Sequence, residues 1–254
     1  MKVTLLQTDI VWNDSAANIA KADALVDANA GSDLYVLPEM WATGFNVEPQ
    51  TMAETEEGPS LIWMRRKASQ TGAAIAGSLA TMLKDGRYVN RLYFVKPSGD
   101  GAFYDKRHLF AFAGEQRYYT AGQERVVVEW KGVRILLQVC YDLRFPVFSR
   151  NKNDYDMVLY VASWPEKRQT AWDTLLRARA IENQCFVAGV NRVGDDPHCH
   201  YAGATMLVDA YGQQLGTCRR DEEEALTTTV DMEALRSFRR RFPVLEQGEE
   251  FSIR

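Results

Sequence analysis

The chain has 254 residues, of which 46% are hydrophobic and 25% are charged. This composition is ordinary for a soluble globular protein, and the length suits one α/β enzyme domain over residues 1–254, which could bury roughly 70–75% of the surface of its unfolded chain. The net charge of −4 argues against a nucleic-acid partner, because no basic stripe is available to neutralise phosphates.

The N-terminal segment, MKVTLLQTD, fits neither a signal peptide nor a membrane span. Asp9, Asn13 and Asp14 interrupt its apolar run. No membrane contact is therefore expected. Four cysteines at unpatterned positions favour a reducing cytoplasm over a disulfide framework.

Strands and helices are expected to alternate along the chain. The first four are a strand at 3–7, a helix at 15–29, a helix from about 59 to 72 and a strand at 73–79. Hairpin signals at 95–102, 130–132 and 210–213 indicate antiparallel pairs beside parallel ones, hence mixed sheets. A third helix is expected at 170–184, with Thr170 and Asp173 forming a start that resembles a capping box.

Ionisable side chains stand at the ends of three predicted strands. Glu39 follows the apolar segment LYVLP, Lys106 follows a short strand at 103–104, and Cys140 follows the apolar run at 135–139. Side chains at the ends of strands point into the cleft above the sheet in α/β enzymes. A carboxylate, an ammonium and a thiol placed there can act as base, oxyanion partner and nucleophile.

Eight segments in a fixed order carry a resemblance to a known family. They are VTLLQTDIVW, LPEMWATGF, DKRHLF, CYDLRFP, ASWPEKR, RARAIENQ, GVNRVG and LVDAYG. These segments resemble the carbon–nitrogen hydrolase (nitrilase) superfamily, and within it most closely the bacterial omega-amidases. The resemblance implies an α/β fold, namely a four-layer α-β-β-α sandwich of two mixed sheets with outer helices. It also implies a Glu–Lys–Cys triad, and we expect no cofactor.

The three residues of this triad would divide the chemistry of amide hydrolysis. A thiol with a pKa near 8.5 is only a few per cent ionised at pH 7, so Glu39 would take its proton and later give it to departing ammonia. Lys106 and the backbone N–H of Tyr141 would hold the oxyanion, a role in which one donor is worth about 3–4 kcal/mol. The family's additional glutamate matches Glu115, which would orient Lys106 and the substrate amide; the alternative is a plain loop carboxylate.

Arg168 is the candidate for a substrate carboxylate, because a guanidinium matches a carboxylate with two parallel hydrogen bonds. An ion pair with Glu166 or Asp173 is the alternative. Trp164 should belong to the same site, since it lies just past a predicted strand.

Residues beside the catalytic segments have both structural and functional interpretations. Trp41, Phe45 and Phe112 flank these segments and are candidate pocket walls, although core packing explains aromatic residues equally well. Asp142 and Arg144 are expected to brace the turn after Cys140 through an ion pair.

Two other arrangements of reactive groups have alternative interpretations. His198, Cys199 and His200 suggest a metal site, but alternating residues point to opposite sides and no second cluster completes a tetrahedral set, so no metal is expected. His108 could serve Cys140 as base in a Cys–His hydrolase, but Glu39 would then have no role.

The sequence therefore predicts an amidase that hydrolyses the terminal amide of small dicarboxylate monoamides through a cysteine thioester. The resemblance implies substrates of the 2-oxoglutaramate or 2-oxosuccinamate type. An N-carbamoyl amide hydrolase or a nitrilase with the same triad, and a non-catalytic binding protein, are the alternatives. A homodimer is expected, because the helix at 170–184 has apolar residues around much of its circumference and the resemblance implies pairing in this region.

Overall fold

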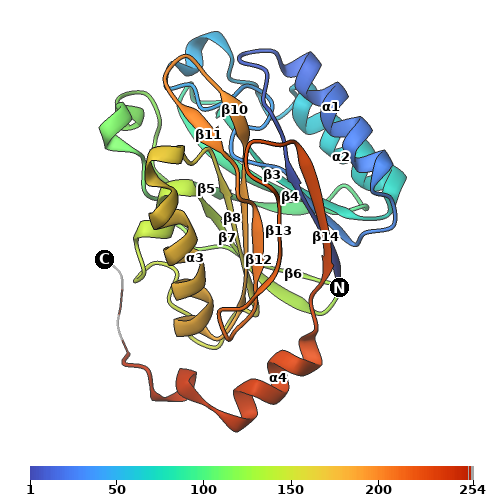
Figure 1. The fold of residues 1–254 in the computed structure, drawn as a ribbon. Coiled ribbons are helices and arrows are strands. Elements are labelled where there is room, and N and C mark those ends of the chain that lie inside the picture. The colour runs from blue at the N-terminus through green and yellow to red at the C-terminus, as the bar shows by residue number, and fades with distance from the viewer. Residues whose placement is uncertain (251, 253–254) are drawn as a thin grey trace.

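A computed structural model describes residues 1–250 and 252; the end of the predicted domain, at 251, 253 and 254, lies outside the described residues. The first of two six-stranded sheets has the order β14-β1-β2-β3-β4-β5 (Figure 1). Strands β1, β2 and β3 are parallel, and the other pairs are antiparallel. The bounds are β1 (Lys2–Gln7), β2 (Leu34–Val36), β3 (Ala74–Met82), β4 (Tyr88–Val95), β5 (Gly101–Asp105) and β14 (Glu224–Thr229).

The second sheet has the order β13-β12-β9-β8-β7-β6. Its central strands β7, β8 and β9 are parallel, and antiparallel strands flank them. The bounds are β6 (Val127–Trp130), β7 (Val133–Val139), β8 (Met157–Ala162), β9 (Phe186–Asn191), β12 (Met206–Val208) and β13 (Gln214–Thr217). A separate hairpin pairs β10 (Val193–Asp195) with β11 (His200–Ala202).

Helices cover the outer faces of both sheets. The first sheet carries α1 (Ser15–Ala28) and α2 (Pro59–Thr71), and the second carries α3 (Gln169–Asn183) on the opposite side of the molecule (Figure 1). A fourth helix, α4 (Met232–Arg241), follows β14 at the lower edge of this view. The predicted α-β-β-α sandwich with two mixed sheets is therefore confirmed.

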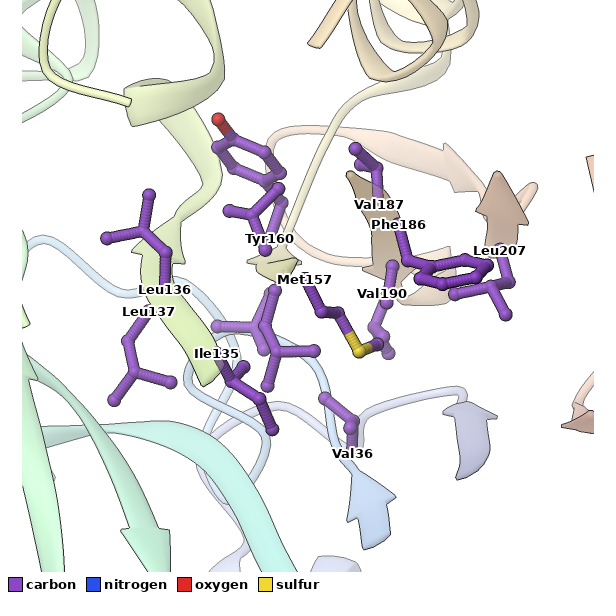
Figure 2. Close-up of a cluster of buried hydrophobic side chains, with 14 of the residues drawn as sticks. Val36, Ile135, Leu136, Leu137, Met157, Tyr160, Phe186, Val187, Val190 and Leu207 are labelled. Atoms are coloured by element: carbon purple, nitrogen blue, oxygen red, sulfur yellow. The ribbon is translucent and has the colours of Figure 1, made fainter. Parts of the chain in front are cut away.

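Alternation along the strands separates two apolar cores. In β1, Leu5 faces the second sheet and joins the central core with Val36 of β2, whereas Leu6 faces the outer helices. Figure 2 shows Val36 among side chains of the second sheet, including Ile135 and Met157. Because β2 buries both faces, its three residues are apolar at consecutive positions.

Packing of α3 against the second sheet depends on a glycine. A Cβ atom at Gly189 of β9 would lie 2.4 Å from a methyl carbon of Leu176 and 2.8 Å from the ring of Trp172. Trp172 is fully buried within one chain, and its Nε1 donates a 3.0 Å hydrogen bond to the backbone oxygen of Ala204. Glycine at this strand position therefore allows the helix to approach the sheet.

The predicted capping box at the start of α3 is wrong. A 3₁₀ turn at Glu166–Arg168 leads directly into the helix, so Thr170 already lies inside its first turn. No side chain caps the helix, and Asp173 instead accepts a 2.9 Å hydrogen bond from the side chain of Gln169.

The predicted hairpins are confirmed: they join β4 to β5, β6 to β7 and β12 to β13. Within the described part of the chain, none of the helices combines the length and the apolar character that crossing a bilayer requires.

Candidate active site

Three strands bring Glu39, Lys106 and Cys140 to one cavity of about 500 Å³. Glu39 lies three residues beyond β2, Lys106 directly follows β5, and Cys140 directly follows β7. Strands β2 and β5 belong to the first sheet and β7 to the second, so the cavity lies where the ends of both sheets meet.

Lys106 lies between two buried carboxylates. Its Nζ donates hydrogen bonds to Oε1 of Glu39 at 2.9 Å and to Oε2 of Glu115 at 2.9 Å, and all three side chains are fully buried. Burial alone would lower the pKa of Lys106, but the carboxylates of Glu115 and Glu39 outweigh this effect and raise it. Lys106 is therefore a permanent cation at this site.

Glu115 is part of the same cluster, and its pKa is raised. Burial is the largest cause, the nearby charge of Glu39 adds to it, and Lys106 opposes both. The backbone N–H of Phe110 donates a 2.5 Å hydrogen bond to the Glu115 carboxylate. This bond ties Glu115 to the loop that forms one wall of the cavity.

Asn90 is a site residue that sequence reasoning missed. It lies inside β4, is fully buried, and donates from Nδ2 to Oε1 of Glu39 at 2.8 Å and to Oε1 of Glu115 at 3.3 Å. Its Oδ1 is buried without a hydrogen-bond partner in the described residues. The available signal was a pair of polar residues, Asn90 and Arg91, between apolar residues of this strand.

Ser163, at the end of β8, contacts both Glu39 and Cys140 through its backbone. Its N–H donates a 2.9 Å hydrogen bond to Oε2 of Glu39, and its backbone oxygen lies 3.9 Å from Sγ of Cys140. Its hydroxyl donates to the backbone oxygen of Glu39 at 3.3 Å. The end of β8 therefore holds the carboxylate beside the thiol.

Cys140 is the first residue of the 3₁₀ helix at Cys140–Arg144, which directly follows β7. Its φ of +45° lies in the left-handed region, which residues with a Cβ rarely adopt. Burial raises the pKa of Cys140 well above its ordinary value, the charge of Glu39 raises it further, and Lys106 opposes both. The resting residue is consequently a neutral thiol.

The predicted ion pair between Asp142 and Arg144 is wrong. Asp142 is buried and accepts hydrogen bonds from the hydroxyl of Tyr104 at 2.8 Å and from the backbone N–H of Val139 at 2.9 Å. Arg144 is exposed and points to the cavity, where its guanidinium carbon lies 5.1 Å from the ring centroid of Trp164. The two side chains leave the turn in different directions.

His108 supports the turn rather than the thiol. Its Nδ1 lies 2.7 Å from Oδ1 of Asp142, and its ring stacks on Phe145 with 3.8 Å between centroids. His108 is not one of the described residues that line the cavity. The geometry thus favours Glu39 over His108 as the partner of Cys140.

Four of the five residues predicted to bind substrate line the cavity: Phe45, Phe112, Trp164 and Arg168. Tyr141, the predicted source of the oxyanion N–H, also lines it. The Nζ of Lys106 lies 5.2 Å from the ring centroid of Phe45, so this ring lies beside the lysine. Phe112 is 85% exposed and therefore lies at the mouth.

Trp41 was predicted to wall the pocket, and this prediction is wrong. Its ring packs on Trp63 of α2, with 5.1 Å between centroids, and it lies against Gly77 of β3. Although Trp41 is only two residues from Glu39, the turn between them directs the indole into the core under the outer helices.

Comparison with known proteins gives the family. The family model described as carbon–nitrogen hydrolase matches residues 2–240. The chain belongs to the carbon–nitrogen hydrolase family. It is therefore a hydrolase acting on carbon–nitrogen bonds other than peptide bonds.

Relatives of this hydrolase align over nearly their whole length. It is 46% identical to the omega-amidase YafV of Escherichia coli strain K12, covering 100% of this chain and 98% of the relative. It is 33% identical to the 2-oxoglutaramate amidase of Bacillus subtilis, covering 96% of each. The crystal structure of XC1258 from Xanthomonas campestris, a CN-hydrolase superfamily protein with an arsenic adduct in its active site, matches with a TM-score of 0.97 and 46% identity over 100% of this chain and 98% of that one.

Arg168 of the hydrolase is held by aromatic rings. Its guanidinium carbon lies 5.1 Å from the ring centroid of Phe110 and 5.4 Å from that of Phe112. The two acids weighed as its ion-pair partners do not pair with it: Asp173 contacts Arg220 at 3.2 Å, and within the described residues no ion pair joins Arg168 to Glu166.

The His198–His200 segment of the hydrolase divides between two surfaces. His198 and Cys199 line the cavity, whereas His200 is exposed. The Nδ1 of His200 lies 2.9 Å from Oδ1 of Asp195, and its Nε2 lies 2.9 Å from Oδ1 of Asp221. In the described part of the chain, no group of three or more histidine, cysteine or acidic side chains is placed to hold a metal ion.

Proposed function

We propose that this hydrolase is an omega-amidase, which converts small dicarboxylate monoamides of the 2-oxoglutaramate or 2-oxosuccinamate type to the acid and ammonia. The observation that carries the proposal is one cavity holding Glu39, Lys106 and Cys140 at one end and Arg168 at its wall. Relatives named omega-amidase and 2-oxoglutaramate amidase support the substrate class.

In the first step, Cys140 attacks the amide carbon. Glu39 takes the proton of the thiol, the S–C bond forms, and the π electrons of the carbonyl move to its oxygen. Lys106 and the backbone N–H of Tyr141 hold the resulting oxyanion. Because the resting thiol is neutral, this proton transfer has to accompany the attack.

In the second step, the oxyanion collapses and the C–N bond breaks. Glu39 returns the proton to the leaving nitrogen, so that ammonia departs and a thioester on Cys140 remains. In the third step, Glu39 deprotonates a water molecule, whose oxygen attacks the thioester carbon. The C–S bond then breaks, Glu39 returns the proton to the thiolate, and the acid is released.

Glu115 and Asn90 position the reacting groups in this scheme. Glu115 holds Lys106 through its 2.9 Å hydrogen bond, in addition to the bond from Lys106 to Glu39. Asn90 donates to both carboxylates and so keeps Glu39 and Glu115 at a fixed separation. A base and an oxyanion donor that are held in place in advance need little rearrangement during the reaction.

Arg168 binds the substrate carboxylate at the other end of the cavity, and Phe45, Phe112 and Trp164 form walls along the carbon chain between. The aromatic rings hold the guanidinium without neutralising its charge, which leaves it available to an anion. This arrangement favours substrates with an amide at one end and a carboxylate at the other.

Ammonia release from a panel of compounds tests the proposal. The panel contains 2-oxoglutaramate, an uncharged short amide, an N-carbamoyl amino acid and an aliphatic nitrile, each with the Cys140→Ala protein as blank. The expected result is the largest kcat/KM for 2-oxoglutaramate. A larger value for the carbamoyl compound or the nitrile would replace the proposal with that activity, and no release from any compound would favour a binding protein.

We also propose a homodimer in the cytoplasm. Ile181 of α3 is 54% exposed, Tyr211 is 53% exposed and Phe242 is 58% exposed. Phe238 joins this patch, since its ring lies 4.0 Å from that of Tyr211. A second copy would cover these side chains. The four cysteines are free thiols, which fits a reducing compartment.

A further inference from the structure

Two arginines share one tryptophan at the wall of the cavity. The guanidinium of Arg144 lies over the ring of Trp164, with 5.1 Å from its carbon to the ring centroid. The Nε1 of the same tryptophan donates a 2.9 Å hydrogen bond to the backbone oxygen of Arg168. Trp164 is buried, so its ring fixes the guanidinium of Arg144 and its Nε1 fixes the backbone of Arg168, and both arginines line the cavity.

Neither arginine is neutralised. In the part of the chain that the structure describes, no ion pair involves Arg144 or Arg168, whereas Lys106 is offset by two carboxylates. Two other acids line the cavity: Asp196 accepts a 2.6 Å hydrogen bond from the hydroxyl of Tyr201, and Glu48 is exposed. The cavity therefore also carries two cations, Arg144 and Arg168, which both contact Trp164 and which no ion pair in the described residues offsets.

We propose that Arg144 is the second cation of the substrate-carboxylate site and sets the preference for a 2-oxo acid over a 2-amino acid. This inference rests on the proposed function. Each guanidinium has five N–H donors, so two guanidinium groups together have more donors than one carboxylate uses. A 2-oxo group adds a further acceptor oxygen beside the carboxylate, whereas a 2-ammonium group adds a positive charge that two cations repel.

Kinetics of Arg144→Met test the assignment. For 2-oxoglutaramate, KM should rise about ten- to a hundredfold, because the variant loses a hydrogen bond between charged groups, while kcat should change little. For butyramide, which has no carboxylate, kcat/KM should change less than about threefold. The ratio of kcat/KM for 2-oxoglutaramate to that for glutamine should fall. Arg144→Lys should keep part of the affinity, because the charge remains but the paired donors are lost.

Lys167→Met is the matched control. Lys167 is an exposed cation next to Arg168 in the chain but does not line the cavity among the described residues. Lys167→Met removes one positive charge, as Arg144→Met does, but leaves every cavity-lining residue in place. KM for 2-oxoglutaramate should therefore stay within about twofold of the parent value.

Calorimetry separates this inference from the proposed amidase activity. Binding of 2-oxoglutarate, the dicarboxylate product, is measured with Cys140→Ala protein and with the Cys140→Ala/Arg144→Met double variant. A tenfold or greater loss of affinity in the double variant supports the carboxylate site, even if no amide is hydrolysed by the parent protein. Unchanged product affinity, or equal losses of kcat/KM on 2-oxoglutaramate and butyramide, would overturn the role of Arg144 while leaving the amidase intact.

Discussion

The Nζ of Lys106 lies 2.9 Å from Oε1 of Glu39, although the two residues are 67 positions apart in sequence. Both side chains are fully buried, so neither charge is stabilised by water. A buried ion pair costs about as much to desolvate as it returns, and removal of one partner typically destabilises a protein by about 3–5 kcal/mol. Such a pair is more readily explained by chemistry at the cavity than by a gain in stability.

Substitutions in the triad should remove activity. Cys140→Ala, Glu39→Gln and Lys106→Ala should each lower kcat/KM for 2-oxoglutaramate by several orders of magnitude, because nucleophile, base and oxyanion donor act as one unit. Ammonia release measures the loss, and thermal melting checks the fold. Glu48→Gln, which changes another cavity-lining acid, should cost less than about tenfold. An inactive His108→Ala beside an active Glu39→Gln would favour a Cys–His mechanism.

The thiol of Cys140 should ionise at a higher pH than an ordinary cysteine. Burial and the charge of Glu39 raise its pKa, so alkylation by iodoacetamide should be slow at pH 7 and still increase above pH 9. Glu39→Gln removes a negative charge and should shift the alkylation profile to lower pH.

Intact-mass spectrometry follows this reaction in a Cys199→Ser background, since Cys199 lines the same cavity. The pKa values of Cys185 and Cys218 are raised to about 12, mainly by burial, so these thiols should react slowly. An unshifted profile in Glu39→Gln would contradict the electrostatic coupling between the two groups.

Catalysis should pass through an acyl group on Cys140. A single base beside a buried thiol favours two steps over direct attack by water. Mass spectrometry of the parent protein incubated with a slow substrate should find an acyl adduct on Cys140 alone, and hydroxylamine should convert the acyl group to a hydroxamate. Single-turnover experiments that yield neither product would count against the thioester.

Asn90 should affect the chemical step rather than binding. Asn90→Ala removes the donor shared by Glu39 and Glu115, and we expect kcat to fall about tenfold or more with a small change in KM. Steady-state kinetics measure kcat and KM separately, and thermal melting checks the fold. A purely structural role would lower the melting temperature without this separation of kcat from KM.

The hydrolase should be a dimer in solution. Light scattering should give about twice the chain mass of 28.8 kDa. Ile181→Glu places a charge in the exposed patch of α3 and should yield monomers. Ile62→Glu is the control, because Ile62 is 50% exposed on α2, away from that patch. A fully active monomer of the parent protein would exclude the dimer as a requirement for function.

Strand ends allowed much of the site to be predicted from sequence. Glu39, Lys106 and Cys140 each follow a predicted strand, which indicated that they face a cleft, and the resemblance to carbon–nitrogen hydrolases implied that the three act together. Hairpin signals indicated mixed sheets, and the resemblance implied the four-layer sandwich.

Contacts that depend on side-chain direction were decided by tertiary structure. Asp142 and Arg144 are two residues apart and of opposite charge, yet one turns inward to Tyr104 and the other outward to Trp164. Asn90 joins Glu39 and Glu115 from a neighbouring strand, and nothing local to β4 indicates those partners. Sequence alone determined which reactive groups end the strands, because strand patterns are local. The side chains that these reactive groups contact were decided by how the two sheets pack, because the contacting residues lie tens of positions away in the chain.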